Sequence, residues 1–194
     1  ICPDFWSNFC FSCIFIIALE RSEMNLFERQ TTINDRATAL TYQTSTVSFA
    51  LSGLINKDYR LSFRQNLNLI LIMTAQQIHL IDRLLHFHDP INRTSIMHRV
   101  FIGQARMIAG LWPQFHEKGS LEFFSDKQLE YFQYSDILSD NEIHYPRHSL
   151  LWEYGEEIAK TSDQSKNHSI ILLTSETYRY SYIDNSDMMH FIYG

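Results

Sequence analysis

Apolar side chains recur at alternating steps of four and three along one central stretch of the chain, which is the spacing of a helix face. The recurring positions are Leu67, Leu71, Thr74, Ile78, Ile81 and Leu85. Five more apolar residues widen this face, namely Ile70, Ile72, Met73, Leu80 and Leu84. Because a helix that is apolar over so much of its circumference is buried on more than one side, we predict a central core helix over Leu67–Leu85.

A second heptad pattern precedes this helix and predicts a long helix over Thr32–Ile55, with Thr31 or Thr32 as its N-cap. The two predicted helices are separated by a short polar break at Asn56-Lys57-Asp58. A short connection makes neighbouring helices antiparallel, so the pattern favours a helical hairpin. A third helix is predicted between Pro90 and Pro113, from about Thr94 to Trp112.

Beyond Pro113 the pattern breaks into short elements. It predicts a strand at Ser120–Phe124, a short helix from Ser125 to about Leu138 and another helix at Ser149–Lys160. Three short apolar or alternating runs then predict an antiparallel β meander: Ile170–Thr174, Tyr178–Ile183 and Met188–Tyr193. The predicted fold class is therefore α+β, with a helical part over residues 24–112 and a mixed part over residues 113–194.

Length and composition predict one main folded unit, because 194 residues that are 45% apolar suffice for one core. We expect this unit to cover residues 24–194, preceded by an apolar segment over residues 1–23. The run Phe5–Leu19 holds about fifteen residues, fewer than the roughly twenty that span a bilayer. Three interpretations stay open: a truncated transmembrane helix, a spurious leader before Met24, or a buried N-terminal helix. All three cysteines lie within the first thirteen residues, so the rest of the chain has no disulfide framework.

Charge is distributed unevenly along the chain, whose formal net charge is -6. Residues 57–106 carry seven basic and three acidic side chains, but the basic ones are scattered along the sequence. Nucleic-acid binding needs a clustered positive face, so we predict no nucleic-acid partner.

Candidate chemistry centres on His79, Asp82 and His86, which share one face of the predicted central helix. Imidazole and carboxylate groups are suitable ligands for zinc or iron, although this spacing matches no specific metal motif. A solvated surface stripe is the favoured alternative. Another helix face carries Glu153, Glu156 and Glu157, and an exposed acidic face is favoured there over acid–base catalysis. No GxSxG motif or glycine-rich phosphate loop occurs, so we predict no catalytic residues and no cofactor.

A candidate ligand site follows from the second predicted strand, where a period of two places Tyr178, Tyr180 and Tyr182 on one sheet face, with Arg179 nearby. Aromatic walls with a few polar groups are typical of small-molecule pockets. The competing interpretation, which we favour, is a half-buried sheet face packed on the helices.

The order of these parts resembles the extracytoplasmic sensor domains of bacterial membrane receptors. An apolar start is followed by a long helix, a helical hairpin and a small aromatic-rich sheet. The resemblance implies a non-catalytic domain that senses a small molecule or protein outside the cytoplasm and is anchored in the bacterial inner membrane through its N-terminal segment. The paired long helices favour a homodimer.

Two other functions compete with the sensor interpretation. The first is a soluble, cytoplasmic interaction or immunity-type protein that starts at Met24. The second is a metal-dependent enzyme that uses the His79, Asp82 and His86 face.

Overall fold

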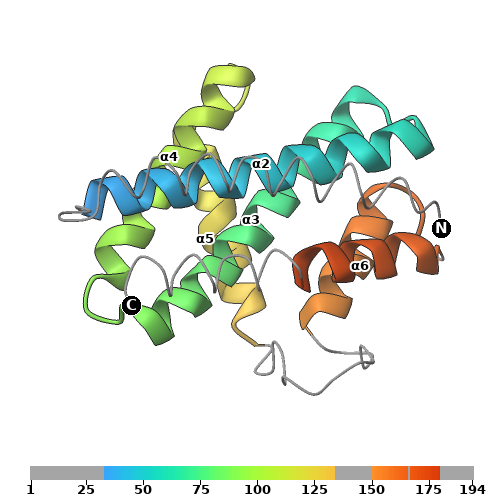
Figure 1. The fold of residues 1–194 in the computed structure, drawn as a ribbon. Coiled ribbons are helices and arrows are strands. Elements are labelled where there is room, and N and C mark those ends of the chain that lie inside the picture. The colour runs from blue at the N-terminus through green and yellow to red at the C-terminus, as the bar shows by residue number, and fades with distance from the viewer. Residues whose placement is uncertain (1–32, 134–149, 166, 180–194) are drawn as a thin grey trace, which may run out of the picture. The chain divides into compact units, whose positions relative to one another are not determined.

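Helices account for all regular secondary structure in the part of the chain that the computed structural model describes, residues 33–133, 150–165 and 167–179. Figure 1 labels five of them: α2 (Ile33–Tyr59), α3 (Phe63–His88), α4 (Arg93–Leu111), α5 (Glu117–Tyr131) and α6 (Leu150–Thr161). A further helix covers residues 168–179. The described helices lie within one compact unit, Ile33–Gly194.

Helix α3 is the centre of this unit, as the apolar pattern predicts, because it packs against α2, α4, α5 and α6 (Figure 1). Its fully buried side chains come from several faces of the helix and include Leu69, Met73, Ile78, Leu80 and Leu84. A capping box fixes its start, in which Gln65 N–H donates to the Ser62 hydroxyl and the Gln65 side chain accepts from Ser62 N–H.

The first and third predicted helices are also confirmed, with shifted ends. Helix α2 continues through the polar break at residues 56–58 and ends after Tyr59. Arg60 then adopts a left-handed backbone conformation, with a φ of 49°, and this stops the helix. Helix α4 packs closely on α2 at Gly103, where an added Cβ would lie 3.0 Å from two side-chain atoms of Thr41.

The α+β prediction is wrong, because no strand occurs in the residues that the structure describes. The predicted strand Ser120–Phe124 lies within α5. The predicted strand Ile170–Thr174 and the start of Tyr178–Ile183 belong to the helix at residues 168–179. A short apolar run fits a buried helix as well as a strand, and here the buried positions follow helical spacing: Ile170, Ile171, Thr174, Ser175 and Tyr178. The third predicted strand, Met188–Tyr193, lies outside the described residues.

Gly155 explains how the last two described helices pack. Glycine weakens a helix interior, yet α6 continues through Gly155. A Cβ at Gly155 would lie 2.6 Å from the backbone oxygen of Ile171. Glycine is therefore required at this position so that α6 and the helix at residues 168–179 can approach each other.

The apolar segment Phe5–Leu19 lies outside the described residues, so its membrane role stays a prediction. Among the helices that the structure does describe, none is both long and apolar enough to cross a membrane.

Candidate functional site

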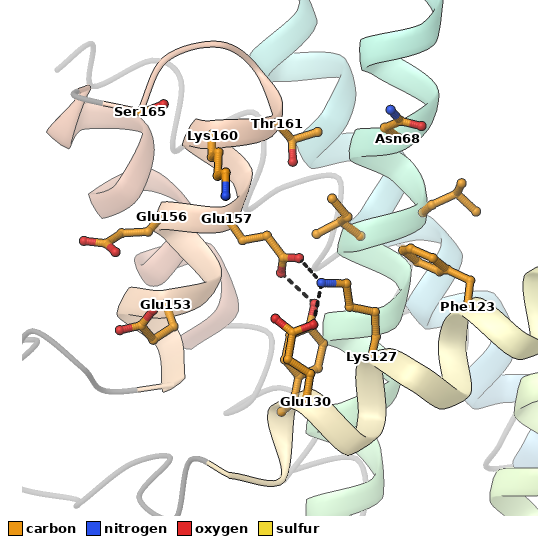
Figure 2. Close-up of a pocket in the computed structure, with 13 residues that line it drawn as sticks. Asn68, Phe123, Lys127, Glu130, Glu153, Glu156, Glu157, Lys160, Thr161 and Ser165 are labelled. Carbon is orange, nitrogen blue, oxygen red and sulfur yellow. Dashed lines mark hydrogen bonds and ion pairs between the residues drawn. The ribbon is translucent and has the colours of Figure 1, made fainter.

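A cavity of about 850 Å³ lies between α3, α5 and α6 and opens to solvent (Figure 2). We call it the α3/α5/α6 cavity. Its apolar wall is formed by Leu71, Ile72 and Phe123. Its charged lining combines four carboxylates with two ammonium groups: Glu130, Glu153, Glu156, Glu157, Lys127 and Lys160. The lining therefore carries a formal charge of -2, from four acids and two bases.

Glu157 joins the three helices at the floor of this cavity. Its Oε1 lies 2.5 Å from Lys127 Nζ of α5. Its Oε2 accepts hydrogen bonds from the Tyr131 hydroxyl at 2.7 Å and from Gln76 Nε2 of α3 at 3.0 Å. These three donors give both oxygens of the carboxylate a partner, and the Glu157 side chain is only about one-fifth exposed.

Lys127 shows how the cavity holds an ammonium group. Its Nζ lies 2.8 Å from Glu130 Oε2 as well as 2.5 Å from Glu157, and Figure 2 shows it between the two carboxylates. It also lies 5.7 Å from the centre of the Tyr131 ring. Burial disfavours the charged lysine, but the hydrogen bonds to Glu130 and Glu157 outweigh it and raise the pKa of Lys127. The site therefore keeps this ammonium positively charged.

The same polar network continues inward to a predicted ligand residue. Tyr178 donates its hydroxyl hydrogen to Gln76 Oε1 at 2.6 Å, and Gln76 in turn donates to Glu157. Burial, followed by the nearby Glu157 charge, raises the pKa of Tyr178 well above its usual value, so its hydroxyl stays protonated. Tyr178 thus supports the cavity floor from behind and does not line the cavity.

The predicted ligand site also included Arg179, Tyr180 and Tyr182, and the strand arrangement predicted for this set is not found at Tyr178 and Arg179. Arg179 follows it on the same helix and pairs with Glu176 at 3.4 Å. Tyr180 and Tyr182 lie outside the described residues. The period-two arrangement fails for Tyr178 and Arg179, because both lie in a helix.

Two of the three predicted metal ligands, Asp82 and His86, contact Arg93, and the third, His79, contacts Gln128. Asp82 forms a two-pronged ion pair with Arg93, at 2.7 and 2.5 Å. His86 Nδ1 lies 3.4 Å from the same guanidinium, whereas the buried His79 Nδ1 lies 2.9 Å from Gln128 Oε1. Within the described residues, no group of three or more His, Cys, Asp or Glu side chains is arranged to hold a metal ion.

Sequence reasoning missed Lys127, Gln76 and Tyr131 as site residues. The acidic face of α6 was visible in the sequence, but Glu157 is half-buried there while Glu156 is exposed. Glu156 and Glu157 differ in their position on α6 relative to the buried residues Tyr154 and Ile158. Which face of α6 is buried becomes clear only from the packing of the helices.

Comparison with known proteins does not assign this chain to a family. No protein-family model matches the chain, and neither a curated protein nor a solved structure matches it at a significant level. The functional inference therefore rests on the residues of the cavity itself.

Proposed function

We propose that the chain is a non-catalytic, ligand-sensing domain of a membrane-bound signalling protein, and that its ligand is a small organic amine bound in the α3/α5/α6 cavity. One observation carries the proposal. Lys127 Nζ already occupies a position between two carboxylates, beside an aromatic ring and an apolar wall. Carboxylates and ring faces are the groups that recognise an alkylammonium ion.

The sheet that the sensor resemblance included is absent from the described helices, so the proposal no longer depends on it. The proposal is supported by the α3/α5/α6 cavity and by the packing of these three helices around it. The membrane part of the proposal depends on Phe5–Leu19 and on the resemblance alone.

Sensing follows from competition between the ligand and Lys127. A ligand ammonium that enters between Glu130 and Glu157 displaces Lys127, and the ion pair that ties α5 to α6 is lost. Glu157 keeps its hydrogen bonds to Tyr131 of α5 and Gln76 of α3, so α6 stays attached to both helices while it loses its ion pair with α5. A ligand that binds one packing of α5 and α6 better than another shifts the population between them.

The experiment is calorimetric titration of the full chain with n-propylamine, which reproduces the part of the lysine side chain beyond Cβ, and with spermidine. We expect both to bind the unaltered chain. We expect Lys127→Ala to bind n-propylamine about tenfold more tightly, because the internal competitor has been removed and two carboxylates are left without their cation. n-Propylamine should also restore thermal stability that the Lys127→Ala variant loses.

Lys118→Ala is the matched control, because Lys118 lies on the same helix and pairs with Glu122 at 3.7 Å on the exposed surface. It should leave amine affinity unchanged, since an exposed pair of this kind contributes little. Absence of amine binding to both the unaltered chain and Lys127→Ala would contradict the proposal. Equal enhancement in both lysine variants would contradict it as well.

A further inference from the structure

A second cavity lies between α2 and α4 and has a volume of about 570 Å³. Its lining differs in charge from that of the α3/α5/α6 cavity. We call this second cavity the α2/α4 groove. Arg99 and Arg106 line it, together with the His98 imidazole, and no carboxylate does. Its size falls within the roughly 300–1,000 Å³ of small-molecule sites.

Helical spacing gathers these side chains on one face of α4. His98, Ile102 and Arg106 follow one another at steps of four, and Arg99 lies beside them. The floor is fixed, because Gln104 Nε2 donates to the backbone oxygen of Thr41 at 2.6 Å and thereby joins α4 to α2. The positive face is therefore held by the tight crossing of two long helices.

The guanidinium and imidazole groups of the groove are available to a ligand. Arg99 and His98 are exposed, and neither has a hydrogen bond or ion pair in the described part of the chain. Arg106 pairs with Glu117 at 3.4 Å, but its side chain is 69% exposed and that of Glu117 is 43% exposed. Such a pair is weak and exchanges readily.

Neutral hydrogen-bonding groups complete the lining. Asn34 contributes a side-chain amide and Ser95 a hydroxyl, and both are exposed. Ser95 lies in the first turn of α4. The charge and the hydrogen-bond donors of the lining thus both favour an anion.

We propose that the α2/α4 groove binds a small molecule that carries a phosphate group. Guanidinium groups pair with phosphate oxygens through two parallel hydrogen bonds, and a doubly charged phosphate can satisfy two arginines where a carboxylate satisfies one. The chain as a whole has a formal net charge of -6, so general attraction does not account for anion binding here. The proposal is independent of the amine cavity.

The test is calorimetric titration of the full chain with inorganic phosphate, glycerol phosphate, acetate and a twelve-nucleotide single-stranded DNA. Both phosphates should bind, and Arg99→Gln should weaken them about tenfold. Arg64→Gln is the matched control, since Arg64 is an exposed arginine on α3 that has no partner among the described residues. It should leave the affinity unchanged. Glu117→Gln should tighten phosphate binding several-fold by freeing Arg106.

The outcomes separate the sources of the phosphate. Tighter binding of glycerol phosphate supports an organic phosphate ester, and equal binding supports inorganic phosphate itself. The proposal is overturned if neither phosphate binds, if Arg64→Gln weakens binding as much as Arg99→Gln, or if acetate binds as tightly as phosphate. The proposal is also overturned if the DNA binds, Arg99→Gln abolishes this binding and neither small phosphate binds. That result would identify the groove as a nucleic-acid surface.

Discussion

At the scale of single residues, His79 is a fully buried titratable side chain whose neighbours fix its protonation state. Gln128 Nε2 donates to the backbone oxygen of Ala75 at 2.9 Å, so Gln128 Oε1 is left to accept from His79 Nδ1–H. A proton therefore lies on Nδ1. The imidazole is neutral, because a second proton on the buried Nε2 would have no hydrogen-bond partner among the described residues. Burial is the main reason why the pKa of His79 falls to about 4.

This shift makes stability depend on pH in a defined direction. Between pH 6.5 and about 4 the unfolded chain binds a proton at His79 that the folded chain does not. The His79 contribution to the free energy of unfolding is therefore complete above pH 6.5 and is lost as the pH falls towards 4, by about 3 kcal/mol. Urea unfolding at several pH values measures it. His79→Gln should remove this part of the pH dependence.

His98→Gln is the control for that experiment, because His98 is exposed and has no partner among the described residues. Its pH profile should match that of the unaltered chain. If the profiles of His79→Gln and the unaltered chain ran parallel between pH 4 and 6.5, the buried neutral state of His79 would be refuted.

At the scale of elements, the contact between α6 and the helix at residues 168–179 depends on the missing side chain of Gly155. We expect Gly155→Ala to lower the free energy of unfolding by about 1–3 kcal/mol, because the new Cβ would lie 2.6 Å from the Ile171 backbone oxygen. Thermal and urea unfolding measure the change.

Gly53→Ala supplies a comparison of opposite sign. Gly53 is an exposed residue within α2, and a Cβ added there would meet nothing within 4 Å. Alanine should therefore stabilise the chain by roughly 0.5–1 kcal/mol through helix propensity. Destabilisation by both substitutions to the same extent would show that close packing at Gly155 is not the cause.

The sequence predicts α2, α3 and α4 well, and the predicted helix Ser149–Lys160 is confirmed as α6. It wrongly assigns strands to parts of α5 and of the helix at residues 168–179, for physical reasons. Helices α2, α3 and α4 are long enough for the 3.6-residue period to repeat several times, and Pro90 and Pro113 bracket α4. The residues Ile170–Thr174 give no such repeat within themselves. Their helix is revealed only by contacts with α6, among them the Ser175 hydroxyl donating to the Leu151 backbone oxygen at 2.9 Å.

At the scale of the whole unit, the candidate site is assembled from residues that are distant in the sequence. Glu157 meets Lys127 from 30 residues away, and Gln76 meets Tyr178 across 102 residues. Local patterns carry no information about such pairs. The sequence did indicate Tyr178 and the acidic face that contains Glu157, but the partners that give them a role come from the packing of α3, α5 and α6.

The α3/α5/α6 cavity and the α2/α4 groove have opposite electrostatic character. The α3/α5/α6 cavity has a lining of formal charge -2, whereas the α2/α4 groove has two arginines and no carboxylate. Helix α3 contacts both α2 and α6, so it connects the helices that border the two sites.

Hydrogen–deuterium exchange of the unaltered chain, with and without saturating spermidine, tests the central claim most directly. Displacement of Lys127 from Glu157 predicts altered amide protection in α5 and α6, with the middle of α3 unchanged because it is buried on all sides. Lys118→Ala should show the same response. Exchange that is identical with and without the amine, or that changes uniformly over all the helices, would contradict a ligand-controlled shift at the α3/α5/α6 cavity.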